Sequence, residues 1–230
     1  MQELKLPVTI HRARLGPVEF KVIRPARPLV RAVLVDHDSH VDAYFDQQAA
    51  KLVGGLWTLA ASSPRSLVHL PMRGNRAPGR ELPKPGSRQL DLVLLHHSLQ
   101  FPPARWKDVR SRLGRGRPQT VTLPRPAKAD EQPADAEARH YRENRDLFHQ
   151  HVHAETLFMT GSAPVFRATA RHFFDVARNG PGYVPVHRGY PHFCTALHSN
   201  AGVLGDAREI HIEYSDQWQA ATDDVPEPGG

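Results

Sequence analysis

Residues 29–42 read LVRAVLVDHDSHVD. Within this stretch the run from Leu29 to Val35 is nearly continuous in apolar residues, which is typical of a strand buried on both faces. The run ends at Asp36, and the residues that follow are dense in histidine and aspartate. Because α/β proteins place their sites at the carboxyl ends of strands, this stretch favours a sheet-based fold with a polar site at one edge.

Apolar patterns on both sides of this stretch predict the rest of the first half. Leu90–Leu95 is a second continuous run of the buried-strand type. Residues His40–Ala61 carry apolar side chains at three- and four-residue spacing, which predicts a helix, and Pro102-Pro103 begins a second, short helix. The further strands expected from apolar and β-branched runs are Leu4–Ile10, Val18–Ile23, Ser66–Leu70 and Thr120–Leu123.

The second half has mainly helical patterns. One helix is expected from Asp135 to about Phe158, and another from Pro164 to Arg178, where the Asn-Gly-Pro-Gly of 179–182 is a stop signal. Arg208–Tyr214 alternates like a half-buried strand. We therefore expect an α/β or α+β fold: a strand-rich N-terminal half with one or two β-α-β units, and a helix-rich C-terminal half that ends in a strand.

The proline- and alanine-containing stretch 127–134 predicts a linker between two domains. On this interpretation residues 1–126 form a basic α/β domain. Residues 135–230 form a helical domain with a terminal strand and a frayed tail.

Composition excludes several classes of protein. With 40% hydrophobic and 23% charged residues in 230, the chain is neither wholly disordered nor a collagen or a coiled coil. Apolar stretches such as Val53–Ala61 are far shorter than the ~20 residues that span a bilayer, and the first residues, MQELK, form no apolar leader. We expect a cytoplasmic protein that does not enter a membrane. The single cysteine, Cys194, excludes an intramolecular disulfide.

Positive charge is concentrated in the middle of the chain. The whole sequence has a net charge of +6, but residues 65–128 hold fourteen Lys and Arg against three acids, a net +11, whereas residues 129–230 have a net −7. Most of the bases are arginines, whose planar guanidinium suits phosphate groups. A GC-rich genome also enriches arginine, but it explains the local excess less well.

The residues Arg115–Pro118 read Arg-Gly-Arg-Pro inside this basic segment. This core resembles the AT-hook, a short element of the minor groove of A·T-rich DNA, although Gly114 stands where the hook usually has proline. The resemblance implies that glycine lets the backbone enter the groove while the arginines extend along it. Such a turn also suits contact with an RNA backbone. A solvated basic turn without a ligand is the alternative.

A second candidate contact is the aromatic and basic segment 183–193, which could provide a stacking platform for bases. Phe101 and Trp106, near the basic turn, could also stack on bases, although such residues are equally typical of a core. The residues expected to contact nucleic acid are Arg105, Lys107, Arg110, Arg112, Arg115, Arg117, Arg125, Lys128, His187, Arg188 and Tyr190.

A candidate metal site follows the two buried-type strands. If these strands are parallel neighbours, the polar side chains after them meet at one sheet edge, where they could hold Zn²⁺, Mn²⁺ or Mg²⁺ and lower the pKa of a bound water. The alternative is that the aspartates cap the next element and the histidines are polar surface. The residues concerned are Asp36, His37, Asp38, His40, His96 and His97.

A further histidine pair is a weaker candidate for metal binding. His149 and His153 lie four residues apart in the helix expected from Asp135, so they would share one face of it and could chelate an ion. With 15 histidines in the chain, pairs at this spacing also arise by chance.

The sequence favours a nucleic-acid-binding protein, with DNA and RNA both open, that acts as a non-catalytic subunit of a larger nucleoprotein assembly and needs no cofactor. The alternative is a metal-dependent hydrolase or nuclease that uses the Asp/His cluster. A third interpretation is a scaffold subunit whose acidic second half binds a basic protein.

Overall fold

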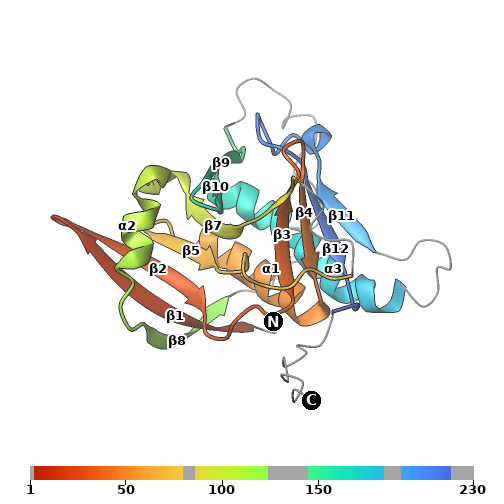
Figure 1. Cartoon of the computed structure of the whole chain (residues 1–230), viewed down its shortest axis with the longest axis horizontal. Coiled ribbons are helices and arrows are strands. Elements are labelled where there is room, and N and C mark those ends of the chain that lie inside the picture. Colours follow the sequence, from red (N-terminus) through yellow and green to blue (C-terminus); the bar gives the residue numbers. More distant parts are fainter. Residues whose placement is uncertain (1–2, 80–85, 124–144, 184–192, 219–230) are drawn as a thin grey trace, which may run out of the picture.

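The computed structural model of the chain describes residues 3–79, 86–123, 145–183 and 193–218 (Figure 1). It confirms the mixed α/β class expected from the sequence, with a sheet-rich N-terminal half. The C-terminal half contains the long helix α3 (Ala163–Tyr183) and ends in the strand β12 (Ile210–Tyr214).

The larger of two sheets has seven strands in the order β8-β1-β2-β5-β7-β10-β9. The pairs β2–β5 and β7–β10 are parallel, and the other neighbours are antiparallel. In chain order its strands are β1 (Leu4–Leu15), β2 (Val18–Pro25), β5 (Ser66–Leu70), β7 (Asp91–His96), β8 (Arg117–Leu123), β9 (His149–His153) and β10 (Thr156–Gly161).

The smaller sheet has five strands in the order β11-β12-β4-β3-β6. Besides β12 its strands are β3 (Ala32–Asp36), β4 (Val41–Phe45), β6 (Arg88–Gln89) and β11 (Cys194–Leu197). Each sheet therefore takes strands from both sides of residues 127–134. The expected division into 1–126 and 135–230 stays a prediction, and the linker itself lies outside the described residues.

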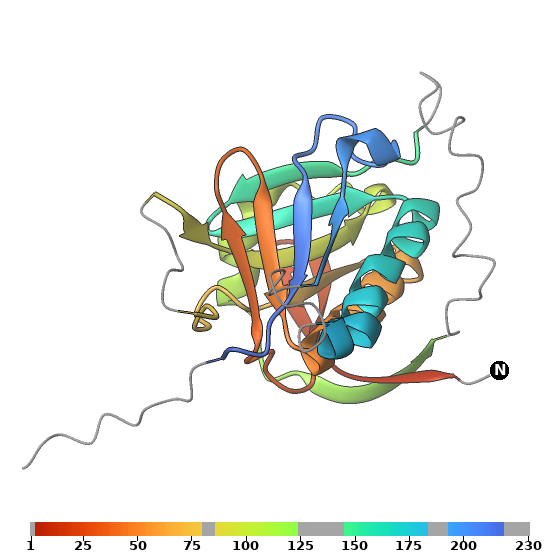
Figure 2. The same cartoon turned by 90° about the vertical axis from the view of Figure 1, so that its right-hand side faces the viewer.

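Two helices join the sheets into one hydrophobic core. Helix α1 (Gln47–Ala61) contacts β1, β5 and β7, whereas α3 contacts β11 and β12, and the two helices pack side by side (Figure 2). Gly54 allows this close approach, because a Cβ there would lie 3.1 Å from the Phe174 ring. The buried Trp57 indole N–H donates to Thr169 Oγ1 at 2.8 Å, which fixes the register of α1 on α3.

A short helix covers the other face of the seven-stranded sheet. Helix α2 (Trp106–Ser111), preceded by a 3₁₀ turn at Pro103–Arg105, confirms the short helix expected after Pro102-Pro103. Its Trp106 and Val109 are fully buried on this face. The β1–β2 hairpin extends beyond the rest of the molecule, at the left of Figure 1, and turns at Gly16, whose φ of 62° favours glycine.

The helix expected over His40–Ala61 begins later than its apolar spacing indicates. Val41, Ala43 and Phe45 alternate with half-buried residues and form β4, and the helix starts at Gln47. Asp46 is its N-cap, since its side chain accepts a hydrogen bond from the Ala49 N–H at 2.7 Å. Apolar residues spaced four apart, such as Val41 and Phe45, fit the period of a helix as well as that of a strand. The boundary between β4 and α1 is therefore not visible in the apolar pattern.

The helix expected from Asp135 to Phe158 is wrong in its described part. The strands β9 and β10 occupy residues 149–161, because Leu157, Phe158 and Met159 are all buried in a strand that lies between β7 and β9 and has apolar neighbours on both faces. The stop signal at 179–182 is also wrong: α3 continues to Tyr183 with Pro181 inside it. Gly180 instead makes room for Tyr214, because a Cβ at this position would overlap the Tyr214 side chain.

We expect both halves of the chain to unfold together. Phe173 of α3 is buried against Phe45 and Trp57 of the first half. Phe173→Ala should lower the free energy of unfolding by about 3–5 kcal/mol and should reduce hydrogen-exchange protection in β5 as much as in β10. Val30→Ala, at a residue that is 67% exposed, is the control and should change little. Protection that persists in β5 alone would contradict a shared core.

Candidate functional site

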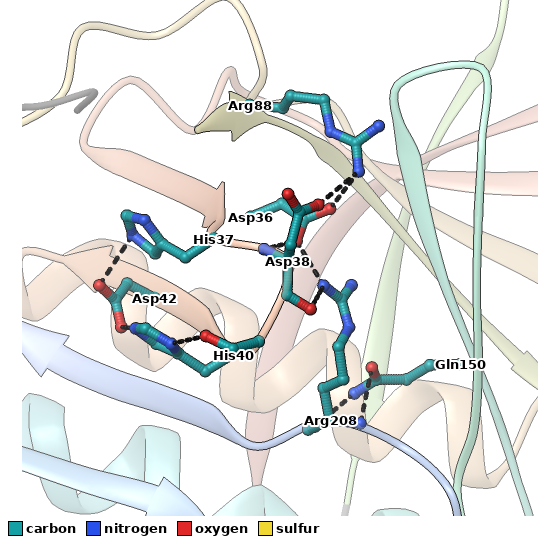
Figure 3. Close-up of polar contacts among 9 residues, drawn as sticks. Asp36, His37, Asp38, His40, Asp42, Arg88, Gln150 and Arg208 are labelled. Atoms are coloured by element: carbon teal, nitrogen blue, oxygen red, sulfur yellow. Dashed lines mark hydrogen bonds and ion pairs between the residues drawn. The ribbon is translucent and has the colours of Figure 1, made fainter. Parts of the chain in front are cut away.

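Two separate groups of polar side chains come together around the turn between β3 and β4 (Figure 3). In the first, Asp36 is buried and accepts hydrogen bonds from Arg88, at 2.9 Å, and from Arg208. Burial by itself raises the pKa of the Asp36 carboxyl, but the hydrogen bonds and charge of the arginines outweigh it and the pKa is lowered. Asp38, the other aspartate expected to bind metal, lies 3.4 Å from Arg88 and is exposed. This group is therefore an ion-pair network.

The second group is a cluster of imidazoles around Asp42. His37 Nε2 lies 3.0 Å from Asp42 Oδ2, and His40 Nε2 lies 3.5 Å from Asp42 Oδ1. His211 of β12 is the register neighbour of Asp42, and its Nδ1 lies 3.4 Å from the same Oδ1. The His37 and His40 rings stack with centroids 4.9 Å apart. Two of the six residues expected to bind metal thus lie together, with two partners that were not among the six.

The structure does not bring His96 and His97 to this cluster. They follow β7 in the seven-stranded sheet, whereas β3 belongs to the five-stranded one, so the two apolar strands are not neighbours. The His96 Nδ1 faces the Ser98 hydroxyl at 2.8 Å, and His97 is exposed. Among the described residues, three or more potential metal ligands come together only at His37, His40 and Asp42. His149 and His153 lie on the strand β9, where His149 faces Asp206.

A buried histidine and aspartate lie beneath α2. Asp91 Oδ1 accepts from the N–H groups of Met72 and Arg73, and its Oδ2 lies 3.3 Å from His69 Nε2. The Arg24 Nε–H donates to His69 Nδ1 at 3.0 Å, so His69 carries its proton on Nε2. Burial lowers the pKa of His69, which stays neutral. No periodicity or motif in the sequence points to this pair, because its members come from different strands.

Two basic segments that are distant in sequence lie together at one edge of the seven-stranded sheet. The strand β8 pairs with β1, and α2 contacts β1 as well. The Arg112 guanidinium donates to the Arg14 carbonyl at 3.4 Å, and His11 Nδ1–H donates to the Gly114 carbonyl at 2.8 Å. The hairpin and the residues around α2 thus form one basic surface, which we call the hairpin surface (residues 12–21 and 105–117).

Not every arginine expected at a phosphate lies on the outside. Arg110 turns inward, with Nη1 at 3.7 Å from the buried Asp91 Oδ2, and only 24% of its side chain is exposed. The Arg105 guanidinium packs over the Phe20 ring at 5.4 Å. Lys107, Arg112, Arg115 and Arg117 are exposed. Arg125, Lys128, His187, Arg188 and Tyr190 lie outside the described residues.

The Arg-Gly-Arg-Pro core does not form a free hook. Arg117 and Pro118 begin β8 and pair with Ile10 and Thr9 of β1. A Cβ at Gly116 would overlap the Thr9 side chain, so the glycine is needed for the approach of β1. Phe101 and Trp106 are buried in the core under α2 and are not available to stack on bases.

Neither family models, nor curated proteins, nor solved structures give a match to this chain. Within the described part of the chain, none of the helices is both long and apolar enough to cross a membrane.

The buried histidines predict how stability depends on pH. Burial lowers the pKa of His69, and burial with the nearby charge of Arg171 lowers that of His172 to about 4. In the unfolded chain both titrate near 6.5. Between these values the unfolded state binds more protons, so the free energy of unfolding falls as the pH drops below about 6.5.

We expect His172 alone to account for about 2 kcal/mol of the loss of stability between pH 7.5 and pH 5. Urea unfolding of His172→Gln at both pH values measures this, and the variant should lose less stability on acidification than the wild type. His151→Gln, at an exposed position of β9, is the control. An unchanged pH dependence in His172→Gln would show that His172 is already protonated in the folded protein.

Proposed function

We propose that this protein binds nucleic acid through its phosphates and that the hairpin surface makes the contact. The observation that carries the proposal is the meeting of two basic segments at one sheet edge. Residues 12–21 and 105–117 together contain nine Lys and Arg and two acids, a net charge of +7. A concentration of positive charge on one surface attracts a polyanion and releases its condensed counterions.

The free cations of this surface support the proposal more than its total charge. Within the described part of the chain, Arg12 pairs with Glu19 and Arg110 with Asp91. Five other exposed side chains of the surface form no ion pair with a described carboxylate. They are Arg14, Lys107, Arg112, Arg115 and Arg117.

The shape of the hairpin also suits a nucleic acid. A two-stranded β-ribbon fits the major groove of B-form DNA, and the β1–β2 hairpin projects from the body with its tip free (Figure 1). Val18 beside the turn is 42% exposed. Because DNA and RNA both carry phosphates, these contacts do not distinguish the two polymers, and the binding assay below compares them. We include in the proposal a non-catalytic role in a nucleoprotein assembly, for which the net −7 of residues 129–230 offers a contact to a basic protein.

The metal-dependent hydrolase is the weaker of the two candidate functions. Its six residues do not meet, since Asp36 and Asp38 pair with arginines and His96 and His97 belong to the other sheet. The cluster around Asp42 keeps only His37 and His40 of these six and adds Asp42 of β4 and His211 of β12.

Neutralising the free arginines tests the proposal. The triple variant Arg112→Ala, Arg115→Ala, Arg117→Ala should weaken binding to labelled duplex and single-stranded DNA and RNA, measured by fluorescence anisotropy over a range of salt concentrations. On duplex DNA the slope of log K against log salt should become shallower by about 0.9 for each phosphate that the variant no longer neutralises. A polymer preference appears as a difference among the four probes.

The matched control removes three cations elsewhere: Lys51→Ala, Arg167→Ala and Arg178→Ala, on α1 and α3. It should leave the slope close to that of the wild type. Equal weakening by both triple variants would show that binding depends on total charge and not on the hairpin surface, and the proposal would fail.

A further inference from the structure

We infer that His37, His40 and Asp42 form a binding site for a divalent transition-metal ion, independent of the hairpin surface. One ligand atom from each of the three residues lies within 4.8 Å of the others. Two come from the β3–β4 turn and the third from β4 itself. The side chains converge on the outer face of the five-stranded sheet, since Asp42 alternates with the inward-facing Val41 and Ala43.

The distances between the candidate ligand atoms fit a small metal ion. Around a tetrahedral Zn²⁺ with bonds of about 2.0–2.1 Å, neighbouring ligand atoms are about 3.3 Å apart. His37 Nε2 lies 3.0 Å from Asp42 Oδ2, and His40 Nε2 lies 3.5 Å from the other carboxylate oxygen, Oδ1. Since one ligand atom from each of the three residues lies within 4.8 Å of the others, side-chain rotations that draw them together would let all three bind one ion.

Two of the ligand atoms lack a hydrogen-bond partner. His37 Nε2 and Asp42 Oδ1 are inaccessible to solvent and form no hydrogen bond in the described structure. Buried polar atoms are nearly always satisfied, and an unsatisfied one calls for a water or an ion. Here one such atom is an imidazole nitrogen and the other a carboxylate oxygen, and both lie in the same cluster. A metal ion between them satisfies both.

The surrounding residues hold the ligands in place before any ion binds. Asp36 fixes the turn through Arg88 and Arg208, and the His37 N–H donates to the His40 carbonyl at 3.0 Å. Tyr44 donates to Asp42 Oδ2 at 3.2 Å. The Ser39 hydroxyl lies 2.9 Å from His40 Nδ1, which leaves His40 Nε2 for the metal. Such supporting contacts orient metal ligands and raise their affinity.

We assign His211 a positioning role. Its Nδ1 lies 3.4 Å from Asp42 Oδ1, and its Nε2 lies 3.9 Å from Glu209 Oε2. It thus links Asp42 to a second carboxylate without belonging to the compact set of three. The fourth coordination position is then left for water or another small ligand, as in zinc sites that are open to substrates.

The donor set decides the class of metal. Two imidazoles and one carboxylate suit Zn²⁺ and other first-row ions such as Co²⁺, Fe²⁺ or Mn²⁺. Mg²⁺ prefers oxygen ligands and keeps several waters. Of the three ions considered from the sequence, this geometry supports Zn²⁺ and Mn²⁺ over Mg²⁺.

Titration calorimetry with ZnSO₄ on the full chain, purified without a metal-affinity column and stripped with EDTA, tests the inference. The wild type should bind one Zn²⁺ per chain, and Mg²⁺ should give no comparable response. His40→Gln and Asp42→Asn should abolish stoichiometric binding, whereas His211→Gln should weaken it about tenfold. The double variant His151→Gln, His153→Gln is the control, because these rings stack at 6.3 Å on β9 without forming a three-ligand group.

A second measurement does not depend on the folding of any variant. In the wild type, Zn²⁺ should shift the side-chain NMR signals of His37, His40 and His211 together, and Co²⁺ should give the intense visible absorption of a four-coordinate site. Absence of stoichiometric binding by the wild type, shifts confined to other histidines, or equal loss in the His151/His153 control would overturn the inference.

Discussion

The paired burial of Asp36 is the constraint on which the rest of the five-stranded sheet depends. An isolated carboxylate with no exposed surface is costly to desolvate, and removing one partner of a buried ion pair is strongly destabilising. Asp36 is compensated by Arg88 of β6 and by Arg208, which precedes β12. Two segments far apart in sequence, around Arg88 and Arg208, are therefore held at the end of β3. The turn that follows β3 is fixed as a result, including Asp38 with its φ of 64°.

Much of the fold could be predicted from the sequence, because continuous and alternating apolar runs report burial directly. The runs around Ala32–Asp36, Ser66–Leu70 and Asp91–His96 all became strands. The pairing of these strands could not be predicted, since hydropathy does not say which sheet a buried strand joins. The expected metal site depended on β3 and β7 sharing one sheet edge, and they belong to different sheets. His37 and His40 were found through composition, whereas His211 needed the β12–β4 register.

The basic segment 65–128 could also be predicted from the sequence only in part. Its charge is visible in the sequence, but the direction of each side chain is not. Arg110 and Arg112 are two residues apart at the end of α2, and one turns toward the buried Asp91 while the other reaches the Arg14 carbonyl at the surface. Gly116 looked like an adaptation to a DNA groove and is instead required by the approach of Thr9. In an edge strand such as β8, a short motif can therefore reflect packing against the neighbouring strand rather than contact with a ligand.

Both candidate surfaces lie where none of the described helices covers the sheet face. In the centre of the seven-stranded sheet, α1 and α2 cover opposite faces, so strands such as β7 are buried on both sides and carry little that a ligand could reach. The β1–β2 hairpin extends past α2 and is basic (Figure 1). On the five-stranded sheet α3 contacts β11 and β12, and the alternate residues of β4 and β12 that point away from the core are Asp42, Tyr44, His211 and Glu213. The period of two in these strands, which builds the core with Val41 and Ile210, is what gathers the polar ligands on the opposite face.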